Sequence, residues 1–358
     1  MGQQVFINVV LFVIGLVLLV KGSDFFVKSA ASIAKKLGVS EFVIGLTLVA
    51  VGTSIPELVS SIIASIKQQS GIVIGNIVGS NIANIGLIIG LAATIRLIKT
   101  KQEMLKRDGY IMLFAALLFY VFIFNRIISR IEAIIFMLFY FAYVVFLFGT
   151  KPKFKGKYNF KEFIRHFFKF KFLTEIKDNG VSYRNNLEGE KIIPIEERKI
   201  RILSKAGLVK DFLILIVSGF AVIFGAEYLV DGAIFFADFF NIPKILIGIS
   251  LVAVGTSLPE LSVSVSAARK GYGDIAIGNI IGSNIVNISF ILGVSALIFP
   301  LSILNSTLFY ETPFMIFMSI LLLLFIKSNW EIRRVEGIVF IILYSVFMTI
   351  LFLGSLVL

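Results

Sequence analysis

The sequence predicts an all-α integral membrane protein with ten transmembrane helices, arranged as two five-helix repeats of inverted topology. Three observations support this prediction: a high apolar content, apolar runs of membrane-spanning length, and a motif that recurs at a constant offset of 203 residues. Hydrophobic residues make up 58% of the chain and charged residues 16%, and the mean hydropathy is +0.97. Soluble domains carry about 25% charged residues, so we expect the lipid bilayer as the surroundings of this chain.

Ten apolar runs are each long enough to cross about 30 Å of hydrocarbon as a helix. They cover residues 5–33, 42–66, 72–97, 108–125, 131–149, 208–240, 244–269, 274–299, 311–327 and 335–357. A transmembrane β-barrel needs alternating segments of about ten residues, whereas these runs are continuous. The first run lacks a preceding basic region and a following small-residue cleavage site, so we expect a retained helix.

The positions of Lys and Arg predict the orientation of the helices. The net charge is +12, and basic residues are concentrated between positions 151 and 210 and in alternate short loops, at Lys35, Arg96, Lys99, Arg269 and Arg333. The intervening loops carry little beyond Lys67, Arg126, Arg130 and Lys244. Because basic loops face the cytoplasm, we expect a multi-pass protein of the cell (inner or plasma) membrane with both termini outside. Five helices is an odd number, so the second repeat enters the membrane inverted.

This topology divides the chain into three regions. They are a first five-helix membrane repeat over residues 1–149, a basic cytoplasmic loop over 150–207, and a second, inverted five-helix repeat over 208–358. In the loop, the segment from Phe160 interleaves Lys and Arg with Phe, so it is either a basic amphipathic helix on anionic lipid or a solvated linker that sets topology. Topology accounts for the basic charge, and we expect no nucleic-acid partner.

The recurring motif places polar residues in the middle of apolar runs. VIGLTLVAVGTSIPEL from Val43 returns as LIGISLVAVGTSLPEL from Leu246, and GNIVGSNIANI from Gly75 returns as GNIIGSNIVNI from Gly278. Each copy of the first motif carries a glutamate, Glu57 or Glu260, and no Lys or Arg of the motif neutralises it. An ionisable group at that depth is costly and indicates a functional site. The duplicated glutamates therefore predict a cation site shared between the two halves of a transporter.

A proline precedes each glutamate and predicts an interrupted helix. Pro56 and Pro259 have no amide hydrogen, and each ring clashes with the carbonyl four residues earlier, so the helical hydrogen bonds should break near Thr53 and Thr256. Broken backbone at membrane depth is tolerated where it is buried in protein or lines a wet cavity. The resulting oxygen atoms suit hard cations such as Ca²⁺ and Na⁺.

The second motif predicts the other walls of this site. Asn76, Ser80 and Asn84 are spaced by four residues and share one helix face, and Asn279, Ser283 and Asn287 repeat this spacing. For four asparagines, interhelical hydrogen bonding and ion contact are both open at this point: Asn76, Asn81, Asn279 and Asn284.

The two motifs together carry a family resemblance. GTSIPE with GNIVGSNIAN, repeated as GTSLPE with GNIIGSNIVN, resembles the two α-repeats of the cation/calcium exchanger superfamily, most closely its prokaryotic sodium/calcium exchangers. The resemblance spans all ten helices and implies the sodium/calcium exchanger fold. It implies that Glu57 and Glu260 bind Ca²⁺ together with the backbone carbonyls of Thr53 and Thr256. It further implies Na⁺ ligation by both glutamates and by Ala50, Ser54, Ser80, Ala253, Ser257 and Ser283. The spacing of the second motif adds Asn84 and Asn287, which bind Na⁺ or line the site.

One position departs from the family pattern. The family often has Asp where this chain has Asn287, so we expect two carboxylates at the site instead of three. Acidic residues on the first and sixth helices, Asp24, Glu227 and Asp231, are expected to line the access path or to cap helices.

The expected function is a secondary active antiporter that exchanges Na⁺ for Ca²⁺ across the cell membrane by alternating access. The resemblance implies electrogenic exchange of about three Na⁺ per Ca²⁺. The alternatives are a Ca²⁺/H⁺ exchanger of the same fold and a passive cation channel. The chain has no cysteine, which excludes thiolate chemistry, and no nucleophile–base pair or nucleotide-binding loop accompanies the repeat, so we do not expect an enzyme. We expect Ca²⁺ and Na⁺ as transported ions and no cofactor.

Overall fold

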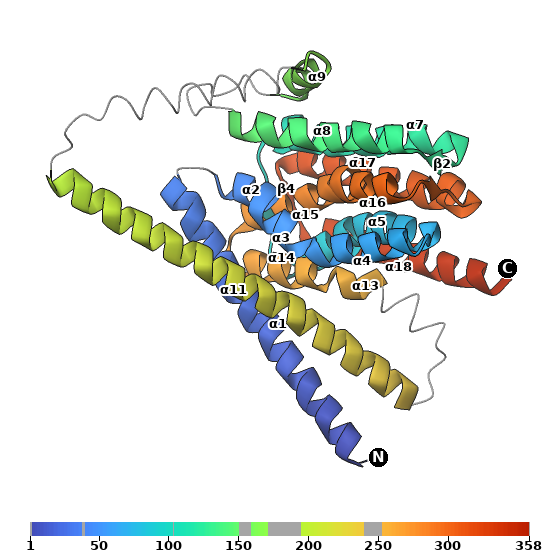
Figure 1. Ribbon diagram of the computed structural model, residues 1–358, viewed down its shortest axis with the longest axis horizontal. Helices are drawn as coiled ribbons and strands as arrows, with labels where there is room; N and C mark the ends of the chain where they lie inside the picture. Colours follow the sequence, from blue (N-terminus) through green and yellow to red (C-terminus); the bar gives the residue numbers. More distant parts are fainter. Residues whose placement is uncertain are drawn as a thin grey trace.

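The computed structural model of the protein describes residues 2–37, 40–102, 104–149, 159–170, 195–239 and 253–357, and most of them are helical (Figure 1). The α-helices of the first half are α1 Gly2–Leu37, α2 Glu41–Ile44, α3 Ala50–Thr53, α4 Ile55–Ile66, α5 Ser70–Ala83, α6 Gly90–Ile95, α7 Tyr110–Phe122 and α8 Arg130–Gly149. The later α-helices are α9 Phe160–Phe168, α11 Ile195–Phe239, α13 Ala253–Thr256, α14 Leu258–Lys270, α15 Gly273–Ile285, α16 Leu292–Ile298, α17 Thr312–Asn329 and α18 Arg334–Val357.

Short π-helical turns extend several of these helices. They are η1 Gly45–Val49, η2 Asn84–Ile89, η3 Met104–Gly109, η6 Val286–Ile291 and η7 Thr307–Glu311, and Ile123–Asn125 forms a 3₁₀ turn. The turns η2 and η6 occupy equivalent places in the two halves, and each begins within two residues of a predicted site asparagine, Asn84 or Asn287. Such π-helical turns occur frequently at functional sites.

The predicted all-α membrane architecture is confirmed. Eight helices of the described ranges are long and apolar enough to cross a membrane, and the bent pair Glu41–Thr53 and Ile55–Ile66 makes up to nine. Of the run predicted over 244–269, the part before Ala253 lies outside the described residues. The helix predicted from position 208 begins earlier, at Ile195. Residues 195–206 contain Glu, Lys, Arg and Leu without Pro or Gly, and such residues extend a helix that apolarity alone does not reveal.

The two spans that carry the second motif form the centre of the molecule. In the most apolar part of residues 70–95, 72% of the residues are buried, and 83% are buried in residues 273–298, against 17% in the α1 span. In contrast, α1 and α11 pack along each other on the outside of the bundle (Figure 1). The site motifs are thus held in a packed core, while two long helices lie against one flank of it.

Glycines allow the core helices to approach each other closely. A Cβ atom on Gly282 would lie 2.5 Å from the backbone oxygen of Leu46, and one on Gly278 would lie 2.6 Å from that of Phe42. No side chain fits at these distances, so α15 packs directly against the backbone of α2 and η1. The contact holds α15 against the segment that leads to Thr53.

Two short antiparallel strand pairs join the halves. β1 Ile98–Lys99 pairs with β4 Glu331–Ile332, and β2 Ile127–Ile128 pairs with β3 Leu301–Ser302. The equivalent strands β1 and β3 each pair with a strand of the other half, as an internal two-fold relation requires. β2 and β4 lie at opposite ends of the bundle (Figure 1). β1 and β4 lie in basic loops, which the distribution of Lys and Arg predicts to be cytoplasmic. β2 and β3 lie in loops that are predicted to be on the other side of the membrane.

Candidate ion-binding site

Both site helices are interrupted where the prolines predict. Ser54 separates α3 from α4 with φ −83° and ψ 11°, and Ser257 separates α13 from α14 with φ −87° and ψ 5°. The two segments around Ser54 are bent by 45°. Pro56 and Pro259 lie in the first turns of α4 and α14, where a missing amide hydrogen costs no helical hydrogen bond. The interruption therefore directs a new helix N-terminus into the core of each half.

Glu57 and Glu260 follow these interruptions, and both are buried, with 2% and 1% of their surface exposed. Each lies in the first turn of its helix, where the backbone dipole favours a negative group. The hydroxyl of Ser54 donates to Glu260 Oε1 at 2.9 Å, and that of Ser257 donates to Glu57 Oε1 at 3.3 Å. Each carboxylate is thus held by the serine of the opposite repeat, so one site contains parts of both halves.

Four buried acceptor oxygens of this region have no hydrogen-bond partner among the described residues. They are Oε2 of Glu57, Oε2 of Glu260, Oδ1 of Asn84 and Oδ1 of Asn287. A buried acceptor without a partner costs about 1–3 kcal/mol, and more when it is charged. The four atoms form two equivalent pairs across the repeat. Bound cations are partners that such oxygens could take, because carboxylate and amide oxygens are ligands of Ca²⁺ and Na⁺.

The amide groups of Asn84 and Asn287 are anchored by the other two asparagines of the core. Asn84 Nδ2 donates to Asn284 Oδ1 at 2.9 Å, and Asn287 Nδ2 donates to Asn81 Oδ1 at 3.1 Å. These bonds fix the amide orientation and leave Oδ1 of Asn84 and Asn287 as the acceptor that remains. Asn81 and Asn284 make interhelical hydrogen bonds, which is one of the two roles left open by the sequence.

The outer asparagines connect the interrupted helices to the core. Thr53 Oγ1 donates to Asn279 Oδ1 at 3.2 Å, and Thr256 Oγ1 donates to Asn76 Oδ1 at 3.3 Å. Asn76 also donates to the backbone oxygen of Glu57 at 3.1 Å. The side chains of both asparagines are therefore used in interhelical hydrogen bonds, and they position the backbone beside the glutamates.

Two serines of the site were missed by the sequence interpretation. Ser61 accepts from Asn76 Nδ2 at 2.9 Å, and Ser264 accepts from Asn279 Nδ2 at 3.0 Å. Both are buried, and they are 203 residues apart, as are the two glutamates. The repeat offset alone would have identified them, because few hydroxyls recur at this offset inside apolar helices.

The remaining predicted residues surround the same centre. Ser80 and Ser283 are buried, and their hydroxyls lie within hydrogen-bond distance of those of Ser257 and Ser54, at 3.2 Å and 3.1 Å, respectively. Ala50 is buried, and its carbonyl accepts the Ser54 amide at 3.1 Å. Ala253 is the first residue of α13, and its side chain lies outside the described residues.

The donor set is made of oxygen atoms and carries two formal charges. No group of three His, Cys, Asp or Glu side chains with metal-ligand geometry occurs in the described part of the chain. The two carboxylates give the site a charge of −2 when both are ionised. This matches one divalent ion or two monovalent ions, and it does not resemble the sulfur and imidazole sets that zinc or copper select.

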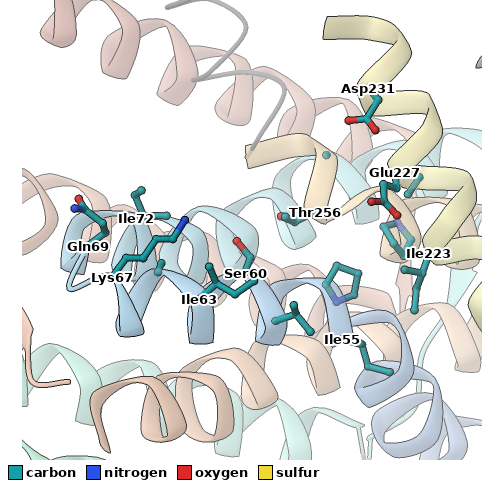
Figure 2. Close-up of a pocket in the computed structure, with 16 residues that line it drawn as sticks. Ile55, Ser60, Ile63, Lys67, Gln69, Ile72, Ile223, Glu227, Asp231 and Thr256 are labelled. Atoms are coloured by element: carbon teal, nitrogen blue, oxygen red, sulfur yellow. The ribbon is translucent and has the colours of Figure 1, made fainter. Parts of the chain in front are cut away.

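A cavity of about 610 Å³ leads to the interrupted helices from one side of the molecule (Figure 2). Lys67, Gln69, Glu227 and Asp231 line it, and it reaches Pro56, Thr256 and Pro259. Figure 2 shows Glu227 and Asp231 on α11 and Lys67 at the end of α4. Glu227 and Asp231 thus line a cavity that reaches the interrupted helices, and its role as the access path stays a prediction. Asp24 does not line this cavity, and instead forms an ion pair with Lys270.

The fold and the site together define a multi-pass membrane transporter with a candidate cation site to which both repeated halves contribute. The sodium/calcium exchanger protein family model matches residues 7–149 and 210–353. The sodium/calcium exchanger MaX1 of Methanosarcina acetivorans is 57% identical over 350 residues, which cover 97% of this chain and 99% of that protein. The membrane protein MJ0091 of Methanocaldococcus jannaschii is 34% identical over 348 residues, 96% of this chain and 97% of that protein.

A solved structure of the sodium-calcium exchanger NCX_Mj, soaked with 10 mM Na⁺ and zero Ca²⁺, is similar with a TM-score of 0.73 and 34% identity. The similarity covers 96% of this chain and 98% of that one. This chain belongs to the sodium/calcium exchanger protein family. The resemblance inferred from the motifs is confirmed, and so is the expectation of a transporter instead of an enzyme.

Proposed function

We propose that this protein is an antiporter that exchanges Na⁺ for Ca²⁺ across the cell membrane, by alternating access to the site of Glu57 and Glu260. The observation that carries the proposal is the set of four buried, unpartnered oxygens, two from each half, with the two glutamates linked across the repeat by Ser54 and Ser257. The family membership supports the identity of the two ions. Residues 1–149 and 208–358 would form the two repeats, and 150–207 would form the cytoplasmic loop between them.

Competition for one site would couple the two ions. Glu57 and Glu260 supply two negative charges, which one Ca²⁺ or two Na⁺ neutralise. Both loads use carboxylate, carbonyl, hydroxyl and amide oxygens, so a site filled with one load excludes the other. We assign Ca²⁺ to the glutamates with the Thr53 and Thr256 carbonyls. We assign Na⁺ ligation or site lining to Ala50, Ser54, Ser80, Asn84, Ala253, Ser257, Ser283 and Asn287.

The exchange should be electrogenic. With Asn287 neutral, a site of charge −2 becomes +1 when it loads three Na⁺ and is neutral when it loads one Ca²⁺. Each cycle then moves one net charge, which is worth about 2.3 kcal/mol per 100 mV of membrane potential.

Transport by the purified protein in sealed vesicles tests this proposal. Calcium uptake should require an opposing Na⁺ gradient, and it should respond to an imposed membrane potential. Uptake driven by a pH gradient without Na⁺ would indicate a Ca²⁺/H⁺ exchanger, and uptake driven by a Ca²⁺ gradient alone would indicate a channel. Uptake that requires Na⁺ but does not respond to the membrane potential would support antiport and contradict the stoichiometry of three Na⁺ per Ca²⁺.

The proposed orientation is open to a cysteine test because the chain has no cysteine. Ser306 follows β3 and Lys169 follows α9, and both are exposed. We expect Ser306→Cys to react with an impermeant thiol reagent applied to intact cells, and Lys169→Cys to react only after the cells are permeabilised. The basic loops would then be cytoplasmic, as positively charged short loops generally are. The opposite labelling pattern would place both termini in the cytoplasm and the central loop outside the cell.

A further inference from the structure

On the side of the molecule opposite the cavity, polar contacts join α1 to α14. The carboxylate of Asp24 on α1 accepts from Ser266 Oγ at 2.6 Å and forms an ion pair with Lys270, which ends α14. One turn further into the bundle, the hydroxyls of Ser23 and Ser262 lie 2.6 Å apart. These contacts hold α1 against α14, so α1 covers the site helix at this end.

The repeat offset of 203 residues identifies the equivalent positions in the other half. The equivalents of Asp24, Lys270, Ser23, Ser262 and Ser266 are, respectively, Glu227, Lys67, Ala226, Val59 and Ile63. All five of these equivalents line the open cavity. α1 and α14 therefore contact each other through one set of positions. The cavity separates the equivalent positions of α11 and α4.

Of these contacts, only the one between an acidic residue and a lysine has the same types of residue at both places. The hydroxyls of Ser23, Ser262 and Ser266 are replaced by apolar side chains, whereas an acidic residue and a lysine recur as Glu227 and Lys67. Both are exposed to the cavity, and no ion pair joins them in the part of the chain that the structure describes. Figure 2 shows them apart, on α11 and at the end of α4. Opposite charges across a water-filled gap attract each other and would meet if the gap closed.

We infer that Glu227 and Lys67 form an ion pair in the second conformation of the transporter, and that this pair replaces the Asp24–Lys270 pair. The inference rests on the alternating access of the proposed function. In an inverted repeat, the second conformation arises when the two halves exchange their arrangements. The α11–α4 surface then adopts the closed contact that α1 and α14 make here. The two pairs are latches that alternate, and their relative strength sets the balance between the two conformations.

The balance can be measured without transport by using the cavity itself. Ser60 lines the cavity, and the chain has no cysteine, so Ser60→Cys introduces the one thiol of the protein. The alkylation rate of this variant in nanodiscs therefore reports how often the cavity is open. In this background, Asp24→Asn or Lys270→Gln should slow alkylation by about threefold to fivefold, the effect of losing a partly exposed ion pair. Adding Glu227→Gln to Asp24→Asn should return the rate toward that of the parent, because both conformations then lack their latch.

A matched control comes from a third ion pair of α1. Lys36 and Asp211 pair at 2.7 Å and join α1 to α11, which lie together on the same flank. Asp211→Asn breaks a pair of similar exposure that joins α1 to α11 and does not join either helix to α14 or α4, so it should leave the Ser60→Cys rate unchanged. The charge-exchanged variant Asp24→Lys with Lys270→Asp should restore the rate lost in the single variants.

Two outcomes would overturn the latch. One is an unchanged alkylation rate in Asp24→Asn protein, and the other is a rate that Glu227→Gln fails to reverse. Na⁺-driven Ca²⁺ uptake by the unmodified protein is measured in parallel. Absence of that uptake would contradict the proposed function. Intact uptake together with an unchanged alkylation rate in the Asp24→Asn protein would contradict the latch alone.

Discussion

Replacing Glu57 or Glu260 by glutamine is expected to abolish Na⁺-driven Ca²⁺ uptake, with a loss of at least about 100-fold. Glutamine keeps the size of the side chain, and its Oε1 can still accept the hydrogen bond from Ser257 or Ser54. The protein should therefore insert and fold. The substitution removes one of the two charges at the site, and a divalent ion then leaves its second charge uncompensated in a buried region.

Vesicle uptake with equal amounts of monodisperse protein checks this expectation. Glu41→Gln is the matched control, because Glu41 also lies in the first turn of a membrane helix and is not part of the site. It should transport like the parent. Parent-like uptake by Glu57→Gln or Glu260→Gln protein would remove that glutamate from the site.

Gly282→Ala is expected to lower the thermal unfolding temperature of the purified protein by about 1–4 °C, although alanine is the better helix former. A Cβ atom at position 282 would lie 2.5 Å from the backbone oxygen of Leu46 and 2.7 Å from the Cβ of Ala50. The first neighbour is backbone, which cannot rotate away, so α15 must move from the segment that carries Thr53 and Ser54. Overpacking of this kind costs about 1–3 kcal/mol.

Thermal unfolding in detergent measures this effect. Gly71→Ala is the control, because the nearest atom to a Cβ at that position is a flexible Leu304 Cδ1 at 3.9 Å. It should unfold at the parent temperature or above. Equal stability of the two alanine variants would show that α15 is not held by direct backbone contact.

Much of the site was predictable because its information is local or duplicated. An apolar run with a glutamate and a proline inside it can be identified without knowing any contact, and the second copy of each residue confirms the first. The same duplication contained Ser61 and Ser264, which were missed because serine in an apolar helix is common and is usually satisfied by its own backbone. The hydrogen bonds to Asn76 and Asn279 show what this recurring pair of serines does.

The sequence by itself determined the membrane architecture, the inverted repeat, the interrupted helices and the two buried glutamates, because hydropathy, proline chemistry and the 203-residue offset act along the chain. Tertiary structure decided which partners meet. Ser54 binds the glutamate of the opposite half, and Asn84 and Asn287 leave their oxygens unpartnered while Asn81 and Asn284 hold their amides. It also decided that Asp24 is paired while its equivalent Glu227 faces an open cavity. Two nearly identical segments cannot specify that difference locally, because it comes from the positions of α1 and α11 against the core.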